Sequence, residues 1–203
     1  MNTHKSGFVN IIGNPNVGKS TLMNALVGEK MSIVTSKPQT TRHRIFGILN
    51  EDDYQIVFSD TPGIIEKPIY GMQSSMNKFA FSSFEDADIL LFVTDIYEKY
   101  NGDEPIVNAL KNTDVPKYLI INKTDLDKEN TADDVAKFWE DIITFNEVFF
   151  ISAEQKINTD TLLTKILSDL PEAPAYYPKD ELSDNPERFF VSEMIRENIL
   201  SQY

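Results

Sequence analysis

Residues 8–27 read FVNIIGNPNVGKSTLMNALV: an apolar run, a glycine-bounded loop and a second, largely apolar run. Within them, residues 13–20 match the pattern G-x-x-x-x-G-K-[ST]. This pattern is specific when a strand precedes it and a helix follows, which Phe8–Ile12 and Thr21–Val27 predict. The glycines allow a tight loop whose backbone N–H groups point inward and hold phosphate oxygens together with the helix N-terminus. The stretch therefore predicts a phosphate-binding loop at the start of an α/β fold.

Each position of this loop has an expected role. We expect Lys19 to reach the β- and γ-phosphates of a nucleotide, and the Ser20 hydroxyl to ligate Mg²⁺. The alternative is a glycine turn that merely contains a lysine. A strand before the motif and a helix after it make this alternative the weaker one. The predicted phosphate contacts are Gly13, Asn14, Pro15, Asn16, Val17, Gly18, Lys19, Ser20 and Thr21.

A second motif, DTPG at residues 60–63, follows the apolar segment Gln55–Ser59. The Asp60 carboxylate can hold Mg²⁺, often through a water, because Mg²⁺ keeps part of its hydration shell. Gly63 can bring its N–H close to a γ-phosphate, since it has no side chain to obstruct the approach. Alone, D-x-x-G is a common turn sequence, so the prediction of a Mg²⁺ and phosphate site here depends on the presence of the first motif.

A third motif, NKTD at residues 122–125, follows the apolar strand Lys117–Ile121. Guanine presents its N1–H and its exocyclic amine side by side, and the Asp125 carboxylate can accept both. Adenine would leave that carboxylate unpaired, a mismatch that can reject an analogue by about 10⁴-fold. The Lys123 stem can cover the face of the base. The motif predicts a guanine site.

Two weaker segments complete the set. Residues 38–44, PQTTRHR, lie between the first two motifs, where a threonine-bearing loop could sense a γ-phosphate through Mg²⁺. A basic surface loop without a nucleotide-sensing role is an equally weighted alternative. Residues 152–154, SAE, follow the predicted strand Val148–Ile151, and their backbone N–H groups could meet the guanine carbonyl.

Short apolar strands alternate with longer amphipathic segments, which predicts an α/β sheet with helices on both faces. Ile45–Leu49 and Gln55–Ser59 are joined by a polar turn and predict an antiparallel hairpin. Residues 1–170 are expected to form one nucleotide-binding domain. Residues 171–187 hold four prolines and predict a linker, and residues 188–203 predict a helix that starts an incomplete second domain.

Composition narrows the function classes. The net charge is −13, which argues against a protein that coats nucleic acid through bulk charge, although residues 1–45 carry six Lys/Arg and one acid. There is no cysteine, so disulfides, thiolate metal sites and a cysteine nucleophile are excluded. The apolar runs are too short for a transmembrane segment. We expect a cytoplasmic protein, with peripheral association at the inner face of the cell membrane as a further option.

In this order, the motifs GNPNVGKS, PQTTRHR, DTPG, NKTD and SAE resemble the series of translation-factor-type GTPases. Three longer segments make the resemblance more specific: residues 16–45, 57–64 and 189–200. With them, the chain resembles the Era family of ribosome-assembly GTPases over essentially all its length. The resemblance implies a P-loop GTPase fold. This is a three-layer sandwich whose sheet is mostly parallel with one antiparallel strand.

The resemblance also implies roles for single residues. Thr41 corresponds to the threonine that ligates Mg²⁺ in the triphosphate state, with Thr40 as the neighbouring alternative. The implied metal ligands are thus Ser20, Thr41 and Asp60, and the implied catalytic residues are Lys19, Thr41, Gly63 and Asn16. Guanine-binding positions are Asn122, Lys123, Asp125, Ser152 and Ala153.

Era-type proteins continue into a KH domain that binds small-subunit ribosomal RNA, so GTP, GDP, the small ribosomal subunit and 16S rRNA are the implied partners. A KH domain clamps the nucleic-acid backbone with a GXXG loop. No two glycines of this chain have that spacing. RNA binding is therefore expected of a complete relative and doubted for these 203 residues.

Hydrolysis is expected to be slow without help. Ras-like proteins place a glutamine after D-x-x-G to orient the attacking water, whereas this chain has Ile64 and Ile65. In some relatives an asparagine matching Asn16 helps to hold K⁺ beside the phosphates, where the ion can neutralise transition-state charge. A structural role in the loop is the alternative for Asn16.

Three other functions compete with a GTPase switch in small-subunit assembly. Related GTPases act in tRNA modification or in large-subunit assembly. A P-loop kinase or ATPase would share the first motif, but Asp125 opposes it. A GTP-gated binding module with negligible turnover is compatible with Ile64. For the switch, the two nucleotide states are expected to differ in residues 33–44 and 63–84.

Overall fold

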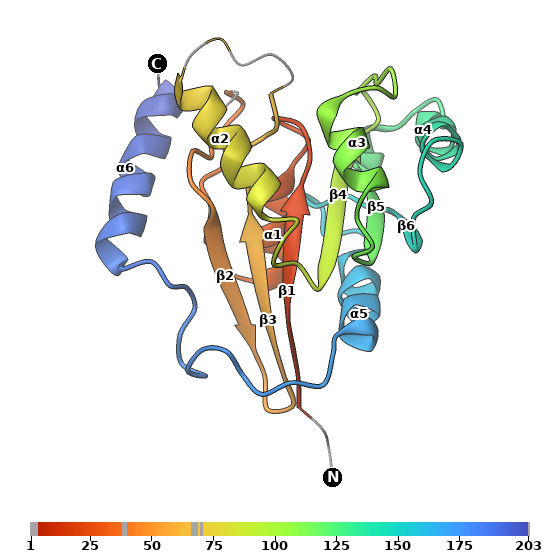
Figure 1. Cartoon of the computed structure of the whole chain (residues 1–203). Coiled ribbons are helices and arrows are strands. Elements are labelled where there is room, and N and C mark those ends of the chain that lie inside the picture. The colour runs from red at the N-terminus through yellow and green to blue at the C-terminus, as the bar shows by residue number, and fades with distance from the viewer. Residues whose placement is uncertain (1–3, 38–39, 66–68, 70, 203) are drawn as a thin grey trace.

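The computed structural model describes residues 4–37, 40–65, 69 and 71–202. Pro38 and Gln39, two residues of the predicted PQTTRHR loop, lie outside the described residues. A six-stranded sheet in the order β2-β3-β1-β4-β5-β6 forms the centre (Figure 1). The strands are β1 (Lys5–Ile12), β2 (Ile45–Asn50), β3 (Tyr54–Asp60), β4 (Ile89–Asp95), β5 (Lys117–Asn122) and β6 (Glu147–Phe150).

Five of these strands run parallel, and β2 pairs antiparallel with β3, which confirms the predicted hairpin and the mostly parallel sheet. β1 lies in the middle, with Val9 facing Phe58 of β3 on one side and Ile89 of β4 on the other. The carboxyl ends of β1, β3, β4 and β5 therefore meet at one edge, which is where open α/β sheets bind their ligands.

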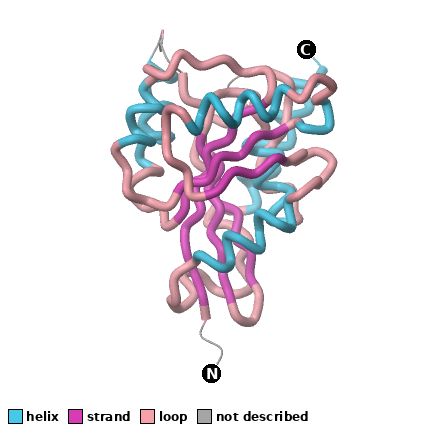
Figure 2. Tube along the Cα trace, turned by 90° about the vertical axis from the view of Figure 1, so that its right-hand side faces the viewer, coloured by secondary structure: helices cyan, strands magenta, loops and turns pink. Residues whose placement is uncertain are grey.

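Helices cover both faces of the sheet, as Figure 2 shows from the side. α1 (Lys19–Val27) and α5 (Thr159–Asp169) bury Leu22 and Leu162 in one apolar cluster. α2 (Gly71–Ser82), α3 (Pro105–Lys111) and α4 (Thr131–Glu140) contribute to the cluster on the opposite face, where Trp139 is fully buried. The helices on the two faces are the outer layers of the predicted sandwich, and one apolar cluster lies between each helical layer and the sheet.

Some element boundaries differ from those that the sequence predicted. Val135, Phe138, Trp139, Ile142 and Ile143 recur at helical spacing, which predicts a helix through Ile143. In the structure α4 ends at Glu140, and Ile143 is buried beyond the end of the helix. α3 was not predicted, because seven residues are too few to repeat a helical pattern. A short 3₁₀ turn, Thr124–Leu126, follows β5.

The predicted linker packs along the edge strand β2. The backbone N–H of Ile48 donates to the Leu182 carbonyl over 2.9 Å, and the Ser183 hydroxyl donates to the Phe46 carbonyl over 2.6 Å. Gln55, fully buried in β3, accepts from the backbone N–H groups of Tyr176 and Tyr177. The segment thus covers sheet polar groups that would otherwise lack partners.

The segment leads into α6 (Glu187–Gln202), which lies beside the sheet at the β2 end (Figure 1). Phe190 packs against the core, whereas Met194 and Ile195 are about half exposed. Within the part of the chain that the structure describes, no helix combines the length and the apolar character needed to cross a bilayer.

Candidate functional site

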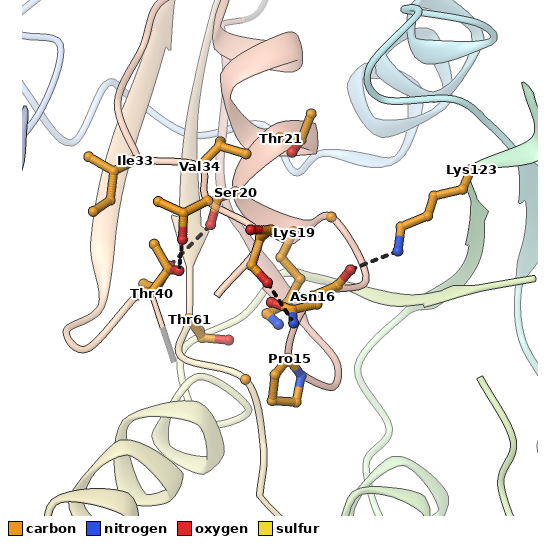
Figure 3. A pocket seen from close by; sticks show the side chains of 15 residues that line it. Pro15, Asn16, Lys19, Ser20, Thr21, Ile33, Val34, Thr40, Thr61 and Lys123 are labelled. Atoms are coloured by element: carbon orange, nitrogen blue, oxygen red, sulfur yellow. Dashed lines mark hydrogen bonds between the residues drawn. The ribbon is translucent and has the colours of Figure 1, made fainter. Parts of the chain in front are cut away.

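The GNPNVGKS loop connects β1 to α1 at the carboxyl edge of the sheet and lines a cavity of about 350 Å³ (Figure 3). Gly18 caps α1 with φ 98°, a left-handed conformation that favours glycine. A Cβ atom at this position would lie 2.2 Å from Nδ2 of Asn122. The loop therefore needs glycine here both for its backbone angle and for its closeness to the NKTD motif.

Lys19 is buried in this loop at 6% exposure, and its ammonium donates to the Asn14 carbonyl over 2.6 Å. Burial lowers the pKa of Lys19 to about 8, although the Asp60 and Glu98 carboxylates act in the opposite direction. A buried cation that is partly desolvated gains strongly from an anion placed beside it. Phosphate oxygens in the cavity would supply that anion.

Three predicted metal ligands converge on one point. Oδ2 of Asp60 accepts from the Ser20 hydroxyl over 2.6 Å and from the Thr41 hydroxyl over 3.3 Å, and the two hydroxyl oxygens lie 3.1 Å apart. Asp60 is fully buried, and this burial raises its pKa. Its Oδ1 atom is buried without a hydrogen-bond partner among the described residues. Such an atom fits a cation.

The donor set suits Mg²⁺, which is held by one or two carboxylates, waters and substrate phosphates rather than by a protein cage. No cluster of three or more His, Cys, Asp or Glu side chains able to hold a metal occurs in residues 4–37, 40–65, 69 and 71–202. Thr40, the alternative to Thr41, donates its hydroxyl to the Lys37 carbonyl over 2.6 Å and lies 2.7 Å from the Thr35 hydroxyl. The geometry therefore favours Thr41 over Thr40 as the metal ligand.

The DTPG segment lies directly against the phosphate loop. A Cβ atom on Gly63 would come within 2.5 Å of the Pro15 nitrogen, so glycine permits this contact. The next residue, Ile64, donates its backbone N–H to the Gly13 carbonyl over 3.2 Å, and its side chain is 3% exposed within the core. The residue at the position of the Ras-like glutamine therefore faces the interior.

The NKTD motif is tied to both neighbouring loops. Asn122, 3% exposed, donates from Nδ2 to the Val17 carbonyl over 2.8 Å, and its Oδ1 accepts from the Ala153 N–H over 2.9 Å. Lys123 donates to the Asn16 carbonyl over 2.8 Å (Figure 3). Asp125 lies in the exposed 3₁₀ turn that follows. One edge of the sheet thus carries the phosphate loop, the NKTD motif and the SAE segment.

The remaining predicted residues take less central positions. Asn16, with φ 66°, lies at the tip of the loop, and its side-chain amide reaches the Ser36 carbonyl at 3.5 Å. Ser152 is buried, and its hydroxyl accepts from the Gln155 N–H over 3.1 Å. Thr21 lines the same cavity.

Sequence reasoning missed two carboxylates at the carboxyl end of β4, one on its last residue, Asp95, and one in the turn that follows. Oδ2 of Asp95 lies 2.5 Å from Nζ of Lys123. Glu98 accepts from the Tyr100 hydroxyl over 2.6 Å and from the Thr94 hydroxyl over 3.1 Å, and burial raises its pKa. The available clue was position, since residues at the carboxyl ends of parallel strands meet at the ligand edge.

Residues 33–44, the predicted switch loop, contact α6 through two of their described residues, Val34 and Thr40. Nη1 of Arg196 donates to the Thr40 carbonyl over 2.7 Å. Glu197 accepts from the Val34 N–H over 3.1 Å and forms an ion pair with Lys30 at 2.5 Å. The helix that the sequence assigned to a second domain thus contacts this loop at two points.

Comparison with known proteins gives consistent matches. Residues 8–123 match the family described as 50S ribosome-binding GTPase. GTPase Era of Lactobacillus delbrueckii subsp. bulgaricus is 47% identical over 197 residues, which cover 97% of this chain and 65% of the relative. The chloroplastic GTPase ERA1 of Zea mays is 45% identical and covered to 49% of its length. This chain therefore spans about two thirds or less of these relatives.

Two solved structures match over nearly the whole chain. An Aquifex aeolicus Era variant bound to GDP·AlF4− has a TM-score of 0.82 and 36% identity, covering 95% of this chain and 66% of that one. An Era complex with MgGDPNP and nucleotides 1506–1542 of 16S ribosomal RNA has a TM-score of 0.83 and 36% identity. The match covers 96% of this chain and 66% of that one.

Proposed function

This chain belongs to the Era family of GTPases, and we propose that it binds guanine nucleotides in the cavity beside Lys19 and hydrolyses GTP with Mg²⁺. The observation that carries the proposal is the pair of Asn122 contacts, to Val17 and to Ala153. These contacts place the proposed phosphate-binding loop directly beside the NKTD and SAE segments, so a single nucleotide would reach all three.

The roles divide along the nucleotide. Backbone N–H groups of residues 13–20 and the Lys19 ammonium hold the β- and γ-phosphates. At the other end, the Asp125 carboxylate accepts from N1–H and the exocyclic amine of guanine, and the Lys123 stem covers the base. Ser152 and Ala153 present backbone N–H groups to the guanine carbonyl. Exclusion of adenine follows, because an adenine would leave Asp125 without its donors.

Ser20, Thr41 and Asp60 would hold Mg²⁺ together with phosphate oxygens, and the unpaired Oδ1 of Asp60 supports that assignment. When bound, the ion neutralises negative charge on the phosphates. Lys19 stabilises the same charge from its buried position, and Gly63 gives its N–H access to the γ-phosphate. Loss of the γ-phosphate would release Thr41 and with it the switch loop.

Turnover by this machinery is slow, since the buried Ile64 side chain cannot orient the attacking water. Asn16 is the residue through which K⁺ would act beside the phosphates. Single-turnover GTP hydrolysis in K⁺ and in Na⁺ at equal ionic strength measures this, and equal rates would remove the role of K⁺. Hydrolysis at background rate under both conditions would instead leave a GTP-gated binding module.

The cellular role we propose is a nucleotide switch in small ribosomal subunit assembly in the cytoplasm, with 16S rRNA as the partner of the complete protein. The Era complex with a 16S rRNA segment supports it. Cosedimentation with small subunits in the presence of GDPNP or GDP tests it, and equal partition in both states would contradict a switch. Fractionation with membranes would decide the further option of peripheral association at the inner membrane face.

The experiment that tests the central proposal is nucleotide affinity. We expect GTP and GDP to bind far more tightly than ATP, and Asp125→Asn to lose that preference, because an amide presents a donor where guanine needs an acceptor. Asp127→Asn is the matched control, since the Asp127 carboxylate accepts from the backbone N–H groups of Thr131 and Ala132 at the start of α4. Unchanged discrimination in Asp125→Asn would contradict the assignment of the base reader.

A further inference from the structure

The loop after β4 fixes one carboxylate in a single orientation. Asp95 is 4% exposed and pairs in register with Asn122 of β5. Its Oδ1 accepts from the backbone N–H groups of Tyr97 over 2.8 Å and Glu98 over 3.0 Å. Its Oδ2 accepts from Lys123 over 2.5 Å. One oxygen thus closes the turn of its own loop, and the other is presented to the lysine of the NKTD motif.

Lys123 is held from two directions. Its backbone is left-handed, with φ 65°, and its ammonium lies between Oδ2 of Asp95 and the Asn16 carbonyl at 2.8 Å. The ring centroid of Tyr97 is 6.0 Å from the same nitrogen. A lysine stem has many rotamers when its end is free. With both ends fixed, the four methylene groups between them run in one direction along the rim of the site.

We infer that Asp95 is a positioning residue for guanine-nucleotide binding, which acts by holding the Lys123 stem where the face of the base packs. The inference rests on the guanine site proposed above. Preorganising a long side chain before the ligand arrives removes the ordering cost from the binding step. Asp95 acts through Lys123 and does not touch the phosphates, so it affects affinity and leaves the chemical step unchanged.

Because the two carboxylate oxygens of Asp95 have different partners, one substitution can remove the contact with Lys123 and keep the contacts within the loop. Asp95→Asn retains a carbonyl oxygen that can accept from Tyr97 and Glu98. Opposite the Lys123 ammonium, however, it places an amide NH₂ group, and this group cannot accept a hydrogen bond. The change also removes a negative charge near an anionic ligand, and that alone would tighten binding. Weaker binding would therefore have the opposite sign to the general charge effect.

The test measures the Kd of GDP by calorimetry for the wild type, Asp95→Asn, Lys123→Ala and the double variant, together with single-turnover hydrolysis at saturating GTP. Losing a charge-assisted hydrogen bond predicts about tenfold weaker GDP binding in Asp95→Asn. The hydrolysis rate should stay within about twofold of the wild type. In the Lys123→Ala background, Asp95→Asn should not weaken GDP binding further, since the residue it acts through is gone.

Asp88→Asn is the matched control. Asp88 precedes the other end of β4, where its carboxylate accepts from the Phe8 N–H over 2.7 Å, so it tests the cost of altering a carboxylate beside the same strand. Thermal unfolding verifies that each variant is folded. Unchanged GDP binding in Asp95→Asn, additive losses in the double variant, or a fall in the hydrolysis rate would overturn the inference alone. A folded wild type that does not bind GDP would overturn the proposed function and this inference with it.

Discussion

The side-chain amide of Asn122 donates to the backbone carbonyl of Val17 over 2.8 Å, across 105 positions of sequence. The other end of the same amide accepts from Ala153. One buried side chain therefore sets the spacing between the loop that we propose to hold phosphates and the two segments that we propose to meet the base. This spacing is a property of the folded chain before any nucleotide binds, which reduces the ordering that binding must complete.

Replacing Asn122 by alanine should damage both stability and binding. The Val17 carbonyl and the Ala153 N–H would lose a partner in a buried place, which costs about 1–3 kcal/mol of unfolding free energy per group. GDP affinity should fall at least about tenfold, because the phosphate and base sites are no longer in register. Urea denaturation and calorimetry measure the two effects.

Asn146→Ala is the control for this variant. Asn146 accepts from the Lys117 N–H over 2.9 Å at the opposite end of β5, away from the cavity. We expect it to lower stability modestly and to leave GDP affinity within about twofold. Equal loss of affinity in the two variants would mean that general stability, rather than the alignment by Asn122, governs binding.

The sequence alone was sufficient to predict the strands and the hairpin and to locate the three motifs, because each depends on local patterns. The strand before Gly13 and the helix after Ser20 follow from apolar periodicity and loop glycines. Contacts between distant segments leave no such pattern. Nothing near Asp95 in the sequence indicates Lys123, and nothing in the proline-rich segment indicates that Leu182 would pair with β2. Such contacts depend on the order of strands, which was not predictable from periodicity.

GDP binding should take up a proton in alkaline solution, because of Lys19. Without ligand, burial lowers its pKa from 10.5 to about 8, so the side chain loses its proton as the pH rises through that value. A bound phosphate favours the charged form and raises the pKa again. Between pH about 8 and 10.5 the complex therefore holds more protons than the free chain, and affinity falls as the pH rises.

Calorimetry at pH about 9 in buffers of different ionisation enthalpy measures this uptake. Lys19→Arg is the control, since a guanidinium stays protonated throughout this range and cannot contribute. Uptake that persists in Lys19→Arg would assign the proton to another group, and absence of uptake in the wild type would mean that Lys19 is already charged in the free chain.

Ile64→Gln should not create a faster GTPase. The Ile64 side chain is 3% exposed and packs in the same cluster as Ile12 and Phe92, so a glutamine there would bury an amide without partners. We expect a loss of about 1–3 kcal/mol in unfolding free energy and no increase in the single-turnover rate. Ile65→Gln, at a half-buried neighbouring position, is the control. Faster hydrolysis in Ile64→Gln with undiminished stability would show that residue 64 faces the nucleotide during turnover.

The contacts between α6 and the switch loop should slow the release of nucleotide. Arg196 holds the Thr40 carbonyl, one residue before the Thr41 hydroxyl that reaches Asp60, and Glu197 holds the Val34 N–H earlier in the same loop. For the loop to move away from the cavity, these hydrogen bonds must break. Each is worth about 0.5–1.5 kcal/mol, so Arg196→Ala should release GDP about two- to twelvefold faster.

Glu197→Gln should act in the same direction, and part of its effect should disappear at high salt, because Lys30 in the Lys30–Glu197 ion pair is largely exposed. Stopped-flow release of a fluorescent GDP analogue measures the rates. Asn198→Ala is the control on the same helix, since its amide donates to the Met194 carbonyl within α6 and not to the loop. If Arg196→Ala and Asn198→Ala released GDP at the same rate as the wild type, the contacts of α6 would be a consequence of packing, and the switch loop would move without reference to this helix.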